Sequence, residues 1–460
     1  MVQFIGRQRE LKIIKDRLNS NSSESLLIYG RRRVGKSELI KESLKDAGVP
    51  VIHYVCRKSS FGQNMSGLSQ AAAKAFNEPF IRFEKIDQLL EYAYSKAVKQ
   101  KIVLFIDEYP FLRGDDEGID SEFQIAIDEW QHKSCLKLIL CGSYVETMQK
   151  LVDSRAPLFG RFTEILKLKP FDYYDTAKFF PDKTCEEKLL IYSVFGGVPF
   201  YLMQLDDRLS PVENIQKLLI PEGSMLESEI RLQLTAELSK EENANFVLEK
   251  IANGVGRYSD ISRDFSGSSG KLSHTLGKLE GMGLIEKDSP INARANRRQQ
   301  RYVICDNLLD FYYSFLFRET TARSAMSPEV FFKSKIESLF NINYFPRKFE
   351  LVAKEYLIRQ NLSGKITPPF SDIGRYVYNN KLKRKNGEFD VVTQDENGMI
   401  SYECKYRQEP IGMKVVHEEE WQAKELEINF YRFGFFSRSG FDENIDGERY
   451  HLISLVDMYR

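Results

Sequence analysis

The chain has few of the residues that build disulfide frameworks and histidine-rich metal sites. Its 460 residues include six cysteines and five histidines, and no two cysteines form a CxxC pair. We interpret the scattered cysteines as buried thiols of a reducing compartment, which excludes a disulfide framework and a cysteine-based zinc site. The isolated histidines likewise disfavour a metal site built on imidazole ligands.

The chain also lacks an excess of charge and a long apolar run. Lys plus Arg and Asp plus Glu each total 66, so the formal net charge is zero, and nucleic-acid binding must rest on local basic patches. No apolar run approaches the length of a membrane span, and the first residues lack the apolar core of a secretory leader. We therefore expect a cytoplasmic protein with no membrane partner. The length suggests about three domains.

The most informative segment that is present is a glycine-rich loop, GRRRVGKS, between a strand-like run and a helix-like run. This is the GxxxxGK[ST] pattern of a phosphate-binding loop in its strand–loop–helix context. Backbone amides of the loop and of the new helix bind phosphate oxygens. Lys36 can reach the β- and γ-phosphates, and Ser37 can hold Mg²⁺. The predicted nucleotide-binding residues of the loop are Gly30, Arg31, Arg32, Arg33, Val34, Gly35, Lys36 and Ser37.

Apolar strand-like runs alternate with helix-like runs over residues 1–170, and that alternation predicts a parallel β-sheet covered by helices. The third run ends in Asp107 and Glu108, at the edge of the sheet where parallel sheets bind ligands. We expect Asp107 to hold Mg²⁺ and Glu108 to polarise the attacking water. The strand-like runs are Leu26–Tyr29, Val51–Val55, Ile102–Ile106, Leu136–Cys141 and Glu164–Leu168.

Two further residues are candidates for contact with the γ-phosphate. Ser143 follows the fourth run and can orient water, although a simple strand-end turn explains it equally well. Arg161 lies in the segment RAPLFGR and can neutralise charge on the transferring phosphoryl group. A solvated surface arginine is the alternative interpretation of Arg161.

The opening segment FIGRQREL, the phosphate-binding loop, FIDEY, PLFGR and GGVPFYL occur in this order. Together they resemble the archaeal-type ATPases of the AAA+/STAND clade, over residues 1–235. The resemblance implies ATP as the nucleotide, with Ile5 and Gly6 beside the adenine. It also places Pro199 on a lid helix that reports the nucleotide state. Read from the residues alone, Gly196, Gly197 and Pro199 break a helix, and a hinge belongs at such a break.

Residues 239–305 carry a pattern of three short helices followed by a hairpin. Leu272, Leu276 and Leu279 form an apolar stripe, which leaves Lys271 and His274 largely off the stripe. The arrangement resembles a winged helix-turn-helix, whose third helix enters a DNA major groove while a basic hairpin tip contacts phosphates. Winged helices also serve as rigid protein-contact modules, so both kinds of partner stay open. The basic residues of the tip are Arg294, Arg297, Arg298 and Arg301.

A second candidate site lies near the end of the chain. Two strand-like segments flank the turn residues Asn397-Gly398, a favoured hairpin dipeptide. The hairpin brings Asp390, Glu403 and Lys405 together, and two carboxylates suit Mg²⁺ while the lysine activates water beside a phosphodiester. The pattern resembles the PD-(D/E)xK nucleases, with Glu350 as the fourth acid on an upstream helix; a structural charge pair or a nuclease fold that no longer cleaves are the alternatives. Basic residues that can grip a nucleic-acid backbone precede the hairpin: Arg375, Lys381, Lys383, Arg384 and Lys385.

The sequence therefore predicts an α/β protein with a P-loop NTPase core, a helical lid, a winged helix-turn-helix and a C-terminal α/β nuclease-like domain. We expect an ATP- and Mg²⁺-dependent protein that acts on DNA, with homo-oligomers left open. The alternative is an ATP-gated regulatory switch that binds DNA or a protein without cleavage. The expected boundaries are 1–170 for the core, 171–238 for the lid, 239–305 for the winged helix, 306–345 for a helical connector and 346–460 for the nuclease-like domain.

Overall fold

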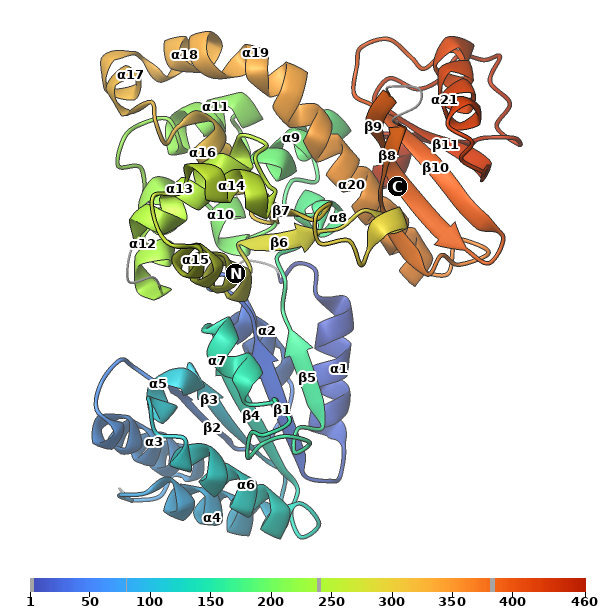
Figure 1. The fold of residues 1–460 in the computed structure, drawn as a ribbon. Helices are drawn as coiled ribbons and strands as arrows, with labels where there is room; N and C mark the ends of the chain where they lie inside the picture. The colour runs from blue at the N-terminus through green and yellow to red at the C-terminus, as the bar shows by residue number, and fades with distance from the viewer. Residues whose placement is uncertain (1–3, 80, 238–240, 381–384) are drawn as a thin grey trace. The chain divides into compact units, whose positions relative to one another are not determined.

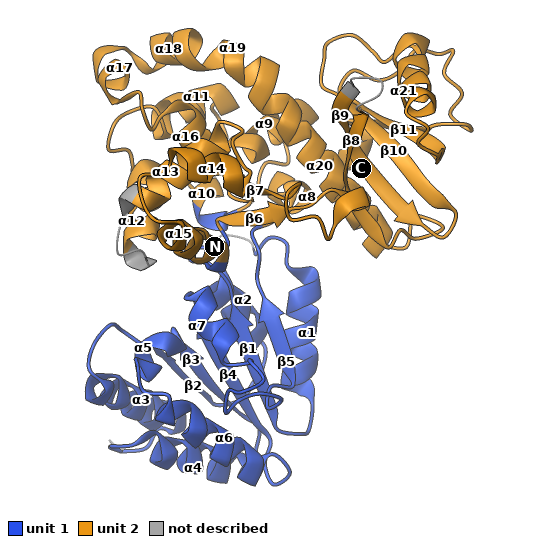
Figure 2. Ribbon diagram, in the orientation of Figure 1, with its two compact units in different colours: residues 1–170, 198–200, 281–283 blue, residues 171–197, 201–280, 284–460 orange. Residues whose placement is uncertain are grey.

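The computed structural model describes residues 4–79, 81–237, 241–380 and 385–460. They form two compact units (Figures 1 and 2). Unit 1 comprises residues 1–170, 198–200 and 281–283, and unit 2 comprises the rest of the chain. Within the described part, no helix is both long enough and apolar enough to cross a membrane.

Unit 1 is built on a five-stranded sheet in the order β2-β3-β4-β1-β5, and all neighbouring strands are parallel. The five strand-like runs of the sequence are thereby confirmed, because each coincides with one strand to within two residues at its ends. The strands are β1 (Glu24–Tyr29), β2 (Val51–Val55), β3 (Ile102–Asp107), β4 (Leu136–Gly142) and β5 (Glu164–Lys167).

Both faces of this sheet are covered. Leu26 and Ile28 pack in one apolar cluster, while Leu27 and Tyr29 pack in the other, as alternation along a strand requires. Burial on both faces explains why these strands are continuous apolar runs instead of alternating ones. The helices of unit 1 are α1 (Gln8–Asn19), α2 (Lys36–Leu44), α3 (Phe61–Phe76), α4 (Ile86–Ala97), α5 (Tyr109–Arg113), α6 (Gly118–Trp130) and α7 (Val145–Lys150).

The first part of unit 2 is helical, as the sequence predicts for the lid. Its helices often begin with a side-chain cap: Thr184 and Ser210 each form a capping box with a glutamate three residues later. The elements of this part of the chain are α8 (Tyr173–Ala177), α9 (Cys185–Phe195), α10 (Pro199–Leu202), α11 (Pro211–Leu218), α12 (Met225–Glu237), α13 (Glu241–Ala252), α14 (Tyr258–Asp264) and α15 (Ser269–Gly281), followed by the antiparallel pair β6 (Ile285–Asp288) and β7 (Arg301–Ile304), with the short helix η1 (Ile291–Ala293) between them. Pro199 and Phe200 of α10 and Gly281 of α15 belong to unit 1.

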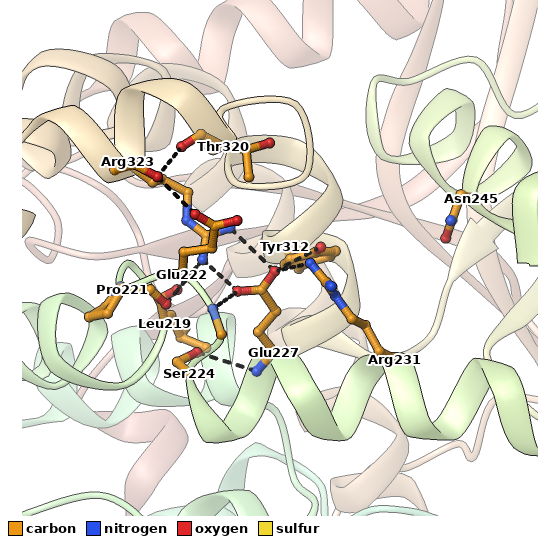
Figure 3. A network of polar contacts seen from close by, with 12 residues as sticks. Leu219, Pro221, Glu222, Ser224, Glu227, Arg231, Asn245, Tyr312, Thr320 and Arg323 are labelled. Atoms are coloured by element: carbon orange, nitrogen blue, oxygen red, sulfur yellow. Dashed lines mark hydrogen bonds and ion pairs between the residues drawn. The ribbon is translucent and has the colours of Figure 1, made fainter.

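A buried ion pair joins the expected lid to the expected connector (Figure 3). Arg323 and Glu227 lie 2.6 Å apart, with side chains 1% and 2% exposed. Arg323 also donates to the carbonyl oxygens of Ile220 and Pro221, and Tyr312 donates to Glu227. Removing one partner of such a pair leaves a buried charge uncompensated, at a cost of about 3–5 kcal/mol. The two segments therefore form one packed body.

The helical connector continues directly into the C-terminal region. Residues 328–362 form an unbroken helical run that contains two π-helical segments, so no break occurs at residues 345–346, where the sequence places a boundary. The elements of the run and of the helices before it are α16 (Asn307–Phe315), α17 (Thr320–Ala325), α18 (Pro328–Phe331), η2 (Phe332–Ile336), α19 (Glu337–Leu339), η3 (Phe340–Tyr344) and α20 (Phe345–Leu362).

The C-terminal region holds a separate mixed sheet in the order β12-β11-β10-β9-β8. Strands β8, β9 and β10 are antiparallel neighbours, whereas β10, β11 and β12 are parallel. The Asn397-Gly398 turn joins β9 to β10, as the sequence predicts. The elements are β8 (Asp372–Asn380), β9 (Lys385–Asp395), β10 (Gly398–Lys405), α21 (Met413–Glu425), β11 (Phe430–Ser437), β12 (His451–Ser454) and η4 (Asp457–Tyr459).

Candidate functional site

The phosphate-binding loop lies between β1 and α2, at the carboxyl edge of the sheet of unit 1. Gly35 precedes α2 with φ 89°, a left-handed conformation that favours glycine. A Cβ on Gly30 would lie 2.2 Å from the carbonyl oxygen of Leu168, so only glycine permits this close approach of two backbones. The two glycines of the motif are thus required by the local backbone of the loop itself.

Lys36 closes the loop on itself. Its side chain is 6% exposed, and Nζ donates to the carbonyl oxygens of Gly30 at 2.9 Å and Arg31 at 3.1 Å. An ammonium group carries three N–H donors. The two contacts use two of these donors and hold the charge at the loop, where the sequence predicts a phosphate.

The two predicted Mg²⁺ ligands meet directly. Ser37 Oγ donates to Asp107 Oδ2 at 2.6 Å, and Asp107 is 2% exposed at the end of β3. A hydroxyl and a carboxylate oxygen are hard donors of the kind that Mg²⁺ prefers. The donor set therefore fits a magnesium ion.

Glu108 and Ser143 are also brought together, from neighbouring strands β3 and β4. Glu108 Oε2 accepts from Ser143 N at 3.1 Å and from Ser143 Oγ at 2.7 Å. Glu108 has φ 53°, an uncommon conformation for a side-chain-bearing residue. The bond to Ser143 fixes the direction of this carboxylate at the same edge of the sheet as Asp107.

Arg161 lies at the other edge of the sheet. It precedes β5, which runs parallel to β1 and pairs Glu164 with Leu26 and Lys167 with Tyr29. The phosphate-binding loop follows Tyr29, so a strand of about 20 Å separates it from the residues before Glu164. Arg161 instead forms a two-point ion pair with Asp128, at 3.2 Å and 3.1 Å. The structure does not bring Arg161 to the phosphate-binding loop of its own chain.

A buried arginine that the sequence motifs did not single out braces the loop. Arg7, 8% exposed, donates to the carbonyl oxygen of Val34 at 3.3 Å and to that of Lys169. It follows directly on Ile5 and Gly6, which the resemblance places beside the adenine. The GR pair of FIGRQREL is the signal for this residue, but its contacts depend on two distant segments.

The segment Val198–Phe200 belongs to unit 1 although its neighbours in sequence belong to unit 2. The guanidinium of Arg33 lies 4.1 Å from the ring centroid of Phe200. A Cβ on Gly35 would lie 3.8 Å from Pro199 Cγ. Pro199 and Phe200 are thus in contact with the phosphate-binding loop.

In the C-terminal region the hairpin pairs β9, which carries Asp390, with β10, which carries Glu403 and Lys405. Asp390 Oδ2 accepts from the backbone N–H of Cys404 at 3.1 Å, and Lys405 forms an ion pair with Glu403. Burial and the nearby carboxylates of Glu403 and Glu350 raise the pKa of Asp390 well above its usual value. Burial and the carboxylates of Glu388 and Glu403 raise the pKa of Glu350 to about 7.

A further acid of this cluster, Glu419 on α21, was missed in the sequence. Burial and the charge of Glu403 raise the pKa of Glu419 to about 8. The signal is the run Glu418-Glu419-Glu420, but only packing decides which of the three faces the sheet. Among the residues that the structure describes, no three carboxylate, histidine or cysteine side chains are placed together as ligands of one metal ion. The charges of Glu350, Asp390 and Glu403 influence one another. Their side chains are nevertheless not placed together as three ligands of one metal ion.

Helix α20, which carries Glu350, is anchored to the lid helices by another carboxylate. Glu355 accepts from Tyr192 Oη at 2.6 Å and from the backbone N–H of Tyr173 at 3.1 Å. Burial raises the pKa of Glu355 to about 7. Helices α8 and α9 therefore set the position of α20 through buried hydrogen bonds within unit 2.

Comparisons with known proteins agree with the first site. A family model described as an ATPase domain predominantly from Archaea matches residues 4–205. A second model, described as archaeal and bacterial proteins of unknown function, matches residues 312–423. An uncharacterized protein of Methanocaldococcus jannaschii is 31% identical over 395 residues, which are 86% of this chain and 85% of that protein.

Two shorter or more distant likenesses point the same way. An uncharacterized ATP-binding protein of the same archaeon is 36% identical over 56 residues, which are 12% of this chain and 95% of that protein. The solved structure of a Walker-type ATPase of Pyrococcus abyssi superposes with a TM-score of 0.50 and 19% identity, covering 67% of this chain and 96% of that one. At this identity the second likeness concerns the fold alone.

Proposed function

We propose, from the premise that the chain belongs to the family of P-loop ATPases found predominantly in Archaea, that it uses ATP to act on DNA. In this proposal the acidic cluster of the C-terminal sheet cleaves phosphodiester bonds. The ATPase itself rests on family membership, and the observation that carries its chemistry is the convergence of Lys36, Ser37, Asp107 and Glu108 at one edge of the sheet.

The chain supplies binding, orientation and a base for ATP hydrolysis. Loop amides and Lys36 bind phosphate oxygens, since both are hydrogen-bond donors at the N-terminal end of α2. Ser37 and Asp107 are the residues that would hold Mg²⁺, which when bound supplies positive charge to the phosphates. Glu108, oriented by Ser143, accepts a proton from water or aligns the water for attack. Nucleotide-dependent change in the loop reaches Pro199 and Phe200 by direct contact.

The case for DNA rests on the helices α13–α15. Leu272, Leu276 and Leu279 are buried, as the apolar stripe predicts, while Lys271, Ser273 and His274 are exposed on the same helix. An exposed polar and basic helix face after two packed helices and before a hairpin is the arrangement that a winged helix offers to a major groove. This supports DNA as the partner of α15.

The case for cleavage rests on the crowding of carboxylates around Asp390. Neighbouring carboxylates raise one another's pKa through electrostatic repulsion. A divalent cation would reduce this repulsion, and carboxylate oxygens are the ligands that Mg²⁺ prefers. Lys405 lies beside Glu403, where its ammonium can stabilise charge that develops on a phosphate. The chemistry of the donors fits Mg²⁺, although three ligands are not placed together.

A specific observation favours the second candidate function, a switch that binds without cleavage. The ammonium group of Lys405 forms an ion pair with Glu403. Among the described residues, no three side chains are placed together as ligands of one metal ion. Under this alternative the C-terminal sheet is a binding module whose charges are satisfied internally, and ATP controls what the module binds.

One experiment separates the two. Purified protein is incubated with supercoiled and with linear DNA, with Mg²⁺ or Mn²⁺, and with or without ATP. Cleavage that disappears in Asp390→Ala while DNA binding persists supports the nuclease; the exposed Glu418→Ala is the matched control. Intact ATP turnover without cleavage under every condition supports the switch.

A further inference from the structure

The loop between β6 and β7, residues 289–300, lies along the edge strand β8 of the C-terminal sheet. Asn292 Nδ2 donates to the carbonyl oxygen of Val377 at 2.8 Å, and the backbone N–H of Val377 donates to Asn292 Oδ1 at 3.2 Å. The side-chain amide thus takes the place of a peptide group from a neighbouring strand. Covering an edge strand in this way protects its free backbone groups.

The same loop also enters the apolar core of that sheet. Ile291 packs against a cluster that contains Phe389, Val392 and Phe430. An isoleucine held in a neighbouring core is a packing contact that a freely projecting hairpin tip does not make.

One arginine of the basic tip is neutralised at the start of β8. Arg294 Nε lies 3.0 Å from Asp372 Oδ2, and Nη2 lies 2.5 Å from Oδ1. Nη2 also donates to the carbonyl oxygen of Ile373. A planar guanidinium bound at two points to a carboxylate is a strong, geometrically defined contact.

A second arginine of the tip joins a four-residue network that reaches β9. Asp288 accepts from Arg301 Nε at 3.0 Å and from Arg375 Nε at 2.6 Å. Both arginines also contact Glu388, at 3.4 Å and 3.1 Å. Burial opposes ionisation of Asp288, yet the hydrogen bond from Arg375 and the charge of Arg301 hold its pKa below the usual value. Arg375, expected to grip nucleic acid, is only 8% exposed, and Lys381, Lys383 and Arg384 lie outside the described residues.

We propose that the 289–300 loop, together with Arg301 at the start of β7, is a clamp that joins helices α13–α15 to strands β8 and β9, and that this role takes Arg294 and Arg301 out of nucleic-acid contact. The clamp ends on Glu388, two residues before Asp390 on β9. Within unit 2, residues 241–280 and 284–304 and the C-terminal sheet then move as one body. DNA bound by this body contacts the exposed Lys271, His274, Arg297 and Arg298 instead. This second part rests on the proposed action on DNA.

The clamp is tested first without DNA, by amide hydrogen exchange of the full chain. Arg294→Asp and Asp372→Arg each place like charges in contact and so weaken the attachment of the loop to β8. We expect the exchange rate of the β8 amides to rise about threefold to tenfold, because the lost contact is stronger than an ordinary exposed ion pair but weaker than a buried one. The double variant Arg294→Asp with Asp372→Arg restores exchange to near the wild-type rate. Arg297→Asp, in the same loop, leaves β8 unchanged. Unaltered exchange in both single variants, or failure of the double variant to restore it, overturns the clamp.

The second part is tested by the salt dependence of binding to a fluorescein-labelled duplex. Removing one side chain that binds a phosphate reduces the slope of log affinity against log salt by about 0.9. We expect the slope to fall in Arg297→Gln and Lys271→Gln and to stay unchanged in Arg294→Gln and Arg301→Gln. A fall in the last two variants overturns the assignment. If the wild type does not bind DNA, the proposed function and this part fall together, and the exchange measurement still decides the clamp.

Discussion

The carboxylates of the two acidic sites of this molecule have different surroundings. In unit 1, Asp107 and Glu108 accept hydrogen bonds from Ser37, Ser143 and a backbone N–H. In the C-terminal region, Glu350 on α20, Asp390 on β9 and Glu419 on α21 lie near other carboxylates, and each has a raised pKa. The first site is organised for its ligand by neutral donors. The second retains repulsion that a proton or a cation would relieve.

The largest effect is expected at the organised site. Lys36→Ala removes the only lysine of the phosphate-binding loop, and with it both hydrogen bonds to the loop carbonyls. We expect ATP turnover to fall by at least about 100-fold, the usual consequence of losing one donor to developing negative charge. Steady-state phosphate release measures this. Lys41→Ala, an exposed lysine on the same helix, is the control; turnover of Lys36→Ala within about threefold of wild type would falsify the assignment.

Glu108→Gln separates chemistry from binding at the same site. The amide keeps the size of the side chain but cannot act as a base, so we expect turnover to fall about 10²–10⁴-fold with ATP affinity nearly unchanged. Equilibrium binding of a fluorescent ATP analogue and turnover are measured on one preparation. Ser143→Ala removes the hydroxyl bond to Glu108 but keeps the bond from the backbone N–H. We therefore expect its turnover to lie between those of the wild type and Glu108→Gln. An equal loss of affinity and turnover would show that Glu108 holds the nucleotide instead.

At the crowded site a substitution should stabilise the protein. The pKa of Glu419 is raised from its ordinary value to about 8, so the native state holds a proton that the unfolded state releases. Wild-type stability therefore falls as pH rises from about 4.5 to 8, and Glu419→Gln does not share this loss. We expect the variant to gain about 1–3 kcal/mol by pH 9 and little at pH 4.5, after allowance for partial exposure.

Urea unfolding at a series of pH values follows this gain. Glu418→Gln, whose side chain is 60% exposed next to it, should show no such trend. Addition of Mg²⁺ should narrow the difference between wild type and Glu419→Gln if the cluster binds the ion. A variant that is less stable than wild type at pH 9 would mean that the carboxylates do not repel one another as described.

The smallest effect is expected for Arg161→Ala. Because Arg161 is bound to Asp128 at the amino edge of the sheet, ATP turnover in the same chain should fall by less than about twofold, and the stability of the fold should change little, since exposed ion pairs contribute little. Dilution of the protein over a wide concentration range provides the decisive measurement. A large loss that grows with concentration would indicate that Arg161 acts on the nucleotide of a second copy.

The organised site was predictable because its information is local. A strand, a loop and a helix in immediate succession determine where Lys36 and Ser37 lie. Asp107 ends β3, which β4 separates from β1, and it was found because parallel strands end at the same edge of the sheet. The C-terminal hairpin was predictable for the same reason, through its Asn397-Gly398 turn. Arg7, Glu419 and the contacts of Arg294 were not, since each depends on segments far away in sequence. Arg375 shows the limit most clearly: a basic residue near other basic residues suggests a free surface, yet its acidic partners come from two other strands.

The passage of Val198–Phe200 through unit 1 has a consequence for how this gene can be divided. A fragment that ends at residue 170 contains all five strands of the sheet of unit 1. It lacks Phe200, whose ring contacts the guanidinium of Arg33. Dividing the chain after residue 170 would therefore separate the phosphate-binding loop from Phe200. A fragment that keeps this contact must extend at least through Phe200.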